Sequence, residues 1–298
     1  MKEYKNYIFD LYGTLIDINC DERSSSLWRL LADQYGVYGC CWKKKEMRDR
    51  FFEMDREERI LLSRKNGSSH PEIKLERVFA RMLLEAPAYT ESSVEIAGRT
   101  VEAWRKINAD YPEEVLKLLS ENDWMVATAN LFRVKSRMYM KLFPHTMSTL
   151  KRLRKTGHGV YLLSNAQRIF TMPEIEQLEL QNCFDRMYIS SDAEIMKPDS
   201  AFMMKLLQEE QLDPEASVMV GNELRSDAGV AMGCGMNSII LNTAGRSKKE
   251  LKKEREKLMK DEKYSSAPVP VIIWSGDIEE ILPSDEKEKE GKKKEEGK

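Results

Sequence analysis

Four groups of polar residues could carry out chemistry, because each follows a predicted strand and the fold could bring them together. The first is Asp10, which ends the run Tyr7-Ile-Phe and is followed closely by a Gly-Thr turn. A carboxylate at the end of a buried strand can attack a phosphorus or carbon centre to form a covalent ester, or can bind Mg²⁺ as a hard oxygen ligand. Such an acid often only caps the next turn, so its role depends on the residues that the fold brings beside it.

The other three groups lie in the second half of the chain. They are Ser164 with Asn165, Lys197-Pro198-Asp199, and the loop from Gly221 to Asp227. Each has an ordinary explanation by itself: the serine could cap a helix, the lysine could be a surface charge, and the acids of the loop could complement a helix dipole. Their occurrence together, in this order, favours one shared site.

Strands and helices alternate in the part of the chain that carries these groups. Apolar runs predict strands at 159–164, 186–190, 217–221, 237–241 and 270–274, with helical patterns between them. This alternation predicts an α/β fold with a doubly wound, parallel (Rossmann-like) sheet. Ligands bind such sheets beyond the carboxyl ends of the strands, so we expect the four polar groups to lie close together there.

Residues 18–142 show helical spacing instead. The apolar positions from Leu75 to Leu83 follow one face of a helix, and no segment of this stretch convincingly predicts a strand. We therefore expect an all-helical domain inserted after the first strand, and a core made of residues 1–17 and 143–283. Residues 284–298 are charged and contain no apolar side chain, which predicts a disordered tail.

Composition narrows the class of protein. The formal net charge of −2 gives no electrostatic case for binding nucleic acid or an anionic membrane. No apolar segment approaches the roughly 20 residues that span a bilayer. The five cysteines form no Cys-x-x-Cys pair, which favours reduced thiols and a cytoplasmic location. The composition does not indicate an oligomeric state.

The order of the four groups resembles that of the haloacid dehalogenase-like hydrolase superfamily. Asp10-Leu-Tyr12-Gly-Thr14-Leu resembles its first motif, Leu163-Ser164-Asn165 its second, Lys197-Pro198-Asp199 its third, and the Gly221–Asp227 loop its fourth. The resemblance covers the predicted core, and the inserted domain is similar in position to the helical cap of this family.

The resemblance implies a hydrolase that acts on a small anionic substrate through an aspartyl ester on Asp10. Ser164 would hydrogen-bond the charged oxygens of the transferring group, and Lys197 would neutralise the charge shared by Asp10 and the substrate. Tyr12, Thr14 and Asn165 belong to the same motifs and complete the expected catalytic set.

The resemblance also implies a metal site, because phosphatase members of the family bind Mg²⁺. Asp10 and the backbone carbonyl of Tyr12 would supply two ligands, and the fourth motif would supply the others. The candidates in that motif are Asn222, Glu223 and Asp227, all of which carry hard oxygen donors.

Tyr12 departs from the phosphatase pattern, in which a second aspartate stands at this position and moves protons. A phenol with an ordinary pKa of about 10 is a poor general base at neutral pH, so a phosphatase with this residue should be slow. The 2-haloacid dehalogenases of the family do carry tyrosine here, and a halide leaves without a proton.

The other motifs favour the phosphatases. Six residues after Lys197, where dehalogenases have a tyrosine, the chain has Met203. The fourth motif has the phosphatase spacing, with Asn222 in place of the first acid. Three functions therefore remain open: a Mg²⁺-assisted phosphatase of a small phosphorylated metabolite, which we favour, a metal-independent 2-haloacid dehalogenase, and a binding or regulatory member of the fold with little turnover.

Overall fold

The computed structural model describes residues 2–283, and the predicted tail at 284–298 lies outside them. The chain divides into two compact units. The core unit consists of the chain up to Asp17, Lys141–Ala166 and the chain from Glu174, and the inserted unit consists of Ile18–Met140 and Gln167–Pro173. Within residues 2–283, no helix combines the length and the apolar character that crossing a membrane requires.

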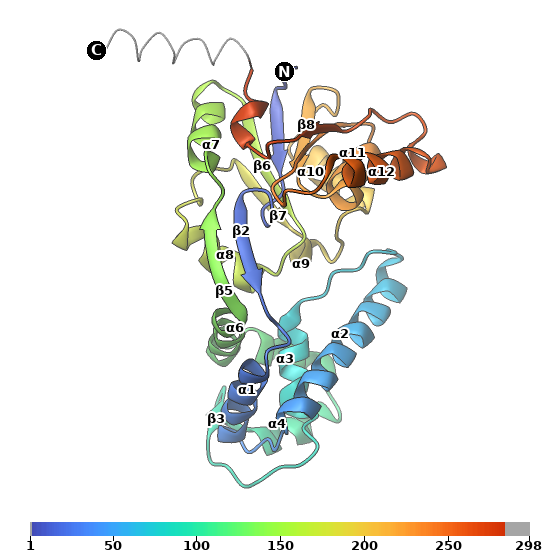
Figure 1. Cartoon of the computed structure of the whole chain (residues 1–298). Helices are drawn as coiled ribbons and strands as arrows, with labels where there is room; N and C mark the ends of the chain where they lie inside the picture. The colour runs from blue at the N-terminus through green and yellow to red at the C-terminus, as the bar shows by residue number, and fades with distance from the viewer. Residues whose placement is uncertain (1, 284–298) are drawn as a thin grey trace, which may run out of the picture. The chain divides into compact units, whose positions relative to one another are not determined.

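A parallel six-stranded sheet forms the centre of the core unit (Figure 1). Its strands are, in spatial order, β10 (Val271–Ile273), β9 (Asn237–Leu241), β8 (Ser217–Gly221), β1 (Asn6–Phe9), β6 (Gly159–Ser164) and β7 (Arg186–Ile189). Every neighbouring pair in this sheet is parallel. The prediction of a doubly wound α/β fold is confirmed.

Both faces of this sheet are buried. Ile8 and Met219 pack on one face against α10 (Ser200–Glu209). Phe9 and Val220 point to the opposite face, because side chains alternate along a strand, and they too are fully buried. Burial on both sides explains why the strands read as uninterrupted apolar runs.

The remaining helical elements of the core unit connect and flank the strands. They are α7 (Thr146–Lys155), α8 (Arg168–Gln177), α9 (Ser190–Ala193), a π-helical turn at Leu224–Ala228, α11 (Gly229–Met232), α12 (Lys248–Met259) and 3₁₀ turns at Glu262–Tyr264 and Ile278–Ile281. Only the last four residues of α8 belong to the core unit, since its first part up to Pro173 lies in the inserted unit.

The inserted unit is built mainly from helices around an aromatic core. The helices are α1 (Ser25–Val37), α2 (Lys44–Asn66), α3 (Leu75–Leu84), α4 (Val101–Asn108), α5 (Pro112–Ser120) and α6 (Asp123–Ser136). Trp28, Phe51, Phe79 and Phe132 pack together with ring centroids 5.1–6.0 Å apart. The helical spacing from Leu75 to Leu83 identified the buried face of α3, where Val78, Phe79, Met82 and Leu83 are buried.

The prediction that residues 18–142 contain no strand is wrong. β2 (Ile16–Cys20) and β5 (Arg137–Leu142) form a two-stranded sheet, and β3 (Glu95–Ile96) pairs with β4 (Arg99–Thr100). Met138 has the helical spacing of the apolar residues Trp124 and Leu131, which predicts a helix there. It lies instead in β5 and is 71 % exposed. β5 pairs with a strand more than a hundred residues away in the sequence, and a local periodicity cannot detect such a partner.

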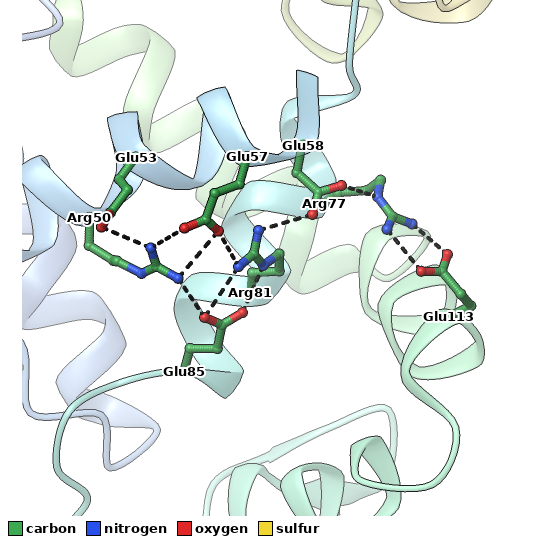
Figure 2. Close-up of polar contacts among 8 residues, drawn as sticks. All are labelled: Arg50, Glu53, Glu57, Glu58, Arg77, Arg81, Glu85 and Glu113. Carbon is green, nitrogen blue, oxygen red and sulfur yellow. Dashed lines mark hydrogen bonds and ion pairs between the residues drawn. The ribbon is translucent and has the colours of Figure 1, made fainter. Parts of the chain in front are cut away.

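Charged side chains link three helices of the inserted unit (Figure 2). The network consists of Arg50, Glu53, Glu57, Glu58, Arg77, Arg81, Glu85 and Glu113. Arg81 on α3 contacts two carboxylates on α2 and one just beyond the end of α3, and Arg77 joins α2 to α5 through Glu58 and Glu113. The network therefore ties α2, α3 and α5 to one another.

Candidate active site

Asp10 lies at the carboxyl edge of the sheet, directly after the central strand β1. The register places Phe9 beside Leu162 on β6 and Val220 on β8. The backbone N–H of Asp10 continues this pairing and donates to the carbonyl of Val220 at 2.9 Å. The carboxylate is thus held between two strands, and the residue is only 7 % exposed.

Lys197 bridges two buried carboxylates. Its Nζ lies 2.7 Å from Asp10 Oδ1 and 2.7 Å from Asp227 Oδ1, and the three side chains are 1–9 % exposed. Charges are rarely buried unless they are paired, because losing the hydration of each ion costs on the order of several kcal/mol. One cation faces two anions here, so the cluster keeps a net negative charge that a further cation could balance.

The burial of this cluster changes the proton affinity of its members. Burial raises the pKa of Asp10 from an ordinary 3.8 to about 6, against the attraction of Lys197, and the negative charge of Asp227 adds to the rise. Burial alone would lower the pKa of Lys197, but Asp10 and Asp227 outweigh it and the pKa is raised. Asp10 is therefore mostly ionised at neutral pH beside a protonated lysine, which is the form that a nucleophile requires.

Two hydroxyl groups orient the Asp10 carboxylate. Thr14 Oγ1 donates to Oδ2 at 3.0 Å, and Ser164 Oγ donates to Oδ1 at 3.3 Å. Thr14 Oγ1 also lies 3.3 Å from Asn222 Oδ1, so its hydroxyl faces the fourth-motif loop as well. Both oxygens of Asp10 are consequently held in a fixed direction.

Asn165 holds the backbone of Lys197. Its Oδ1 accepts from the Lys197 N–H at 2.8 Å, and its Nδ2 donates to the Lys197 carbonyl at 3.0 Å. This pair of bonds positions the lysine from the neighbouring strand end. A catalytic contact for Asn165 stays a prediction, whereas the structure gives it a positioning contact.

The loop after β8 is folded back on itself by Asp227. Asp227 Oδ2 accepts the backbone N–H groups of Asn222 at 3.0 Å and Glu223 at 2.9 Å. A side chain at Gly221 would bring its Cβ within 2.2 Å of the same oxygen, so glycine is required there. Gly13 has a φ of +80°, and a Cβ there would lie 2.4 Å from Asn222 Nδ2. Gly221 thus lets the fourth-motif loop fold back on Asp227, and Gly13 lets the first and fourth motifs approach each other.

The residues around Asp10 suit a hard cation such as Mg²⁺. Oxygen is the ligand atom that Mg²⁺ prefers, and three neighbouring side chains carry it. Asp10 contacts both Thr14 and Lys197. Asn222 contacts the same threonine, and Asp227 contacts the same lysine. The predicted ligand Glu223 differs, because it is exposed and its Oε2 accepts from Ser226 at 3.0 Å. The carbonyl of Tyr12 stays a predicted ligand.

Two contacts at the site involve residues that lie outside the four motifs. The Tyr12 hydroxyl donates to Glu174 Oε2 at 2.5 Å, and Glu174 is 2 % exposed. Thr243, in the segment after β9, donates its hydroxyl to the carbonyl of Gly13 at 2.5 Å. In the sequence Glu174 is one of two acids in the segment of α8, and its burial beside Thr171 and Ile175 is seen only in the structure.

Comparisons with known proteins agree with this fold. A family model described as haloacid dehalogenase-like hydrolase matches residues 4–235. A solved structure of a 2-haloacid dehalogenase from Pseudomonas syringae covers 82 % of this chain and 89 % of its own, with a TM-score of 0.50 and 22 % sequence identity. At this identity the likeness shows the fold alone.

Two curated relatives are phosphatases. A glyceraldehyde 3-phosphate phosphatase of Pyrococcus furiosus is 28 % identical over 130 residues, which make up 44 % of this chain and 54 % of that protein. A phosphoglycolate phosphatase of Pseudomonas putida is 32 % identical over 101 residues, or 34 % of this chain and 36 % of that protein. The matches span about half or less of the length of these relatives.

Proposed function

Because the chain belongs to the haloacid dehalogenase-like hydrolases, we propose that it is a phosphatase of a small phosphorylated metabolite, with Asp10 as the nucleophile. The observation that carries the proposal is the buried cluster of Asp10, Lys197 and Asp227 next to Asn222. Its surplus negative charge and its oxygen donors suit a bound Mg²⁺, which a phosphate dianion needs more than a haloacid does.

The geometry supports two displacement steps. An Asp10 carboxylate oxygen forms a bond to phosphorus, the bond from phosphorus to the ester oxygen breaks, and the leaving alkoxide takes up a proton from the solvent to give the alcohol. Water then attacks the phosphorus of the aspartyl phosphate and returns a proton to the solvent, the bond to Asp10 breaks, and inorganic phosphate leaves with the carboxylate restored.

The residues of the chain have separate tasks in these steps. Lys197 balances the charge of Asp10 and of the incoming phosphate, and Thr14 and Ser164 keep the attacking carboxylate in place. The proposal adds that the Ser164 hydroxyl donates to the phosphoryl oxygens when a substrate is bound. When bound, Mg²⁺ would supply further positive charge at the phosphoryl oxygens, with Asp10, Asn222 and Asp227 as its holders.

The dehalogenase alternative rests on Tyr12 and is opposed by Met203. Where dehalogenases carry a tyrosine, Met203 is fully buried and packs with Ile8 and Phe202, so this position offers no polar group.

The proposal also includes the role of the inserted unit as the cap of the family and a cytoplasmic location. The free state of all five cysteines supports that location.

The test measures phosphate release and chloride release by the wild-type protein and by two variants. Phosphate release from p-nitrophenyl phosphate is followed with Mg²⁺ and with EDTA, and chloride release from 2-chloropropionate is followed in parallel. We expect Mg²⁺-dependent phosphate release that Asp10→Asn abolishes. Asp213→Asn is the matched control, because Asp213 is exposed and its side chain accepts the Glu215 N–H, which asparagine can also do.

The other outcomes contradict the proposal in different ways. Chloride release without metal would make the protein a dehalogenase. Turnover of neither substrate by a folded protein would favour the binding or regulatory member. Phosphate release that Asp10→Asn leaves intact would remove Asp10 as the nucleophile.

A further inference from the structure

The loop 242–246, which follows β9 and lies outside the four motifs, contacts the turn after Asp10. The Thr243 hydroxyl donates to the carbonyl of Gly13 at 2.5 Å, across 230 positions of the chain. Gly13 is followed directly by Thr14, whose hydroxyl donates to Asp10 Oδ2 at 3.0 Å. Two hydrogen bonds and one stretch of backbone thus connect Thr243 to the candidate nucleophile.

The loop that carries Thr243 has a fixed place beside the sheet. Asn242, the residue before it, donates its backbone N–H to the carbonyl of Ile273 in β10 at 3.0 Å. The Asn242 side chain closes the loop, because its Oδ1 accepts the Arg246 N–H at 2.8 Å and its Nδ2 donates to the Arg246 carbonyl at 2.9 Å. The Thr243 hydroxyl is therefore presented by a backbone that is held at both ends of the loop.

The Thr14 hydroxyl has one proton and two acceptors within reach. Asp10 Oδ2 lies 3.0 Å away and Asn222 Oδ1 lies 3.3 Å away. Thr14 is fully buried, and the residue before it, Gly13, has a φ of +80°. Because the two distances differ so little, a small shift of this turn would change which oxygen receives the proton.

We propose that Thr243 is a positioning residue for the nucleophile: it fixes the Gly13 carbonyl and so keeps the Thr14 hydroxyl on Asp10. This inference rests on the proposed function, because it takes Asp10 as the attacking group. An attacking group must point at the atom that it attacks, and a misplacement of about 1 Å can slow a reaction on the order of 10²-fold. Thr243 therefore acts on the rate of attack and not on the affinity for substrate.

The bond could instead serve only to fasten the loop 242–246 to the core, and kinetics separate the two roles. Thr243→Val keeps the branched side chain and removes the hydroxyl, and Thr243→Ala removes the same hydroxyl if valine disturbs the fold. Thr243→Ser keeps the hydroxyl. Thr156→Val is the matched control, because the exposed Thr156 also donates its hydroxyl to backbone carbonyls, those of Arg152 and Leu153 in α7.

The readout is the first release of p-nitrophenol from p-nitrophenyl phosphate after rapid mixing, because this release reports attack by Asp10 and not the later hydrolysis of the aspartyl phosphate. We expect Thr243→Val to lower its rate at saturating substrate about tenfold and to change the half-saturating concentration less than about twofold. Thr243→Ser should stay within about threefold of the wild-type rate, since its hydroxyl can still donate. Thr156→Val should leave the rate unchanged.

A second variant shows whether Thr243 acts through Thr14. Thr14→Val should slow the first release at least as much as Thr243→Val does. The double variant should be no slower than Thr14→Val alone, because the Thr243 hydroxyl has nothing left to position once the Thr14 hydroxyl is gone. Urea denaturation of each variant shows that the proteins compared are folded.

Three results would overturn the inference. A wild-type rate for Thr243→Val would remove Thr243 as a positioning residue and leave the proposed function intact. Loss in Thr243→Ser as large as in Thr243→Val, or a further loss when Thr243→Val is added to Thr14→Val, would reduce the bond to a fastening of the loop. Absence of phosphatase activity in the folded wild-type protein would remove the proposed function, and with it the nucleophile that Thr243 positions.

Discussion

The two units of the protein each contain a cluster of charged side chains, and burial makes the clusters different. In the core unit, Lys197 faces Asp10 and Asp227 with all three side chains nearly excluded from water. In the inserted unit, three arginines and five glutamates form a chain of ion pairs whose members range from buried Glu58 to Glu113 at 73 % exposure (Figure 2).

The carboxylates of the two clusters are shifted in opposite directions. Burial raises the pKa of Asp10 to about 6, whereas hydrogen bonds from arginine lower the pKa of Glu57 and Glu113. A carboxylate that is surrounded by arginine in contact with water stays charged and holds helices together. A buried carboxylate that shares a lysine, such as Asp10, has a pKa closer to neutral pH, which suits it to chemistry.

The largest expected effect is that of removing Lys197. Lys197→Met leaves two carboxylates buried without their cation, and we expect a loss of about 3–5 kcal/mol in the free energy of unfolding. Urea denaturation measures it. Lys205→Met is the control, since the Lys205–Glu209 pair is about half exposed and should contribute under about 1 kcal/mol. A loss for Lys197→Met as small as that of the control would contradict the difference between the clusters.

Arg81→Met should have an intermediate effect. Arg81 contacts Glu57, Glu58 and Glu85, and Glu58 would keep only its bond to Arg77. We expect a loss of about 1–3 kcal/mol by urea denaturation, because a nearly buried carboxylate loses one of its partners.

The control for this variant is Arg48→Met on the same inserted unit. Arg48 pairs with the adjacent, largely exposed Asp49, and its loss should cost under about 0.5 kcal/mol. Equal losses for Arg48→Met and Arg81→Met would show that the network adds nothing to simple pairs.

The pH dependence of activity should reflect the raised pKa of Asp10. A raised pKa disfavours the carboxylate, so the nucleophile is lost as the pH falls through about 6. Below that value kcat/KM for p-nitrophenyl phosphate should fall about tenfold for each pH unit. Asp227→Asn removes a charge that raises this pKa, so the residual activity of that variant should persist to lower pH. A flat profile between pH 4.5 and 7 would contradict the assignment.

The smallest effect is expected at the exposed end of the inserted network. Glu113→Gln removes one partner of Arg77, and we expect under about 0.5 kcal/mol of lost stability, because the pair is screened by water and Arg77 keeps Glu58. The difference should vanish in 1 M NaCl, where the Debye length is about 3 Å. A loss that is unchanged by salt would point to packing instead of charge.

The sequence by itself determined the fold and the order of its motifs. Apolar runs predicted the strands at 159–164, 217–221 and 237–241 with the bounds that the structure has. Strands buried on both faces leave a continuous apolar signal, and parallel topology gathers their carboxyl ends at one edge. For that reason Asp10, Ser164, Lys197 and Asp227 could be expected together, as the structure finds them.

Only the tertiary structure decided which side chains touch. Glu174 meets Tyr12 across 162 positions of the chain, and β5 pairs with β2, which is more than a hundred residues away in the sequence. Asn165 holds the backbone of Lys197, and Glu223 faces Ser226 instead of the oxygen cluster. Such contacts depend on rotamers and on loops that converge from distant segments, and neither leaves a periodic signal in the local sequence.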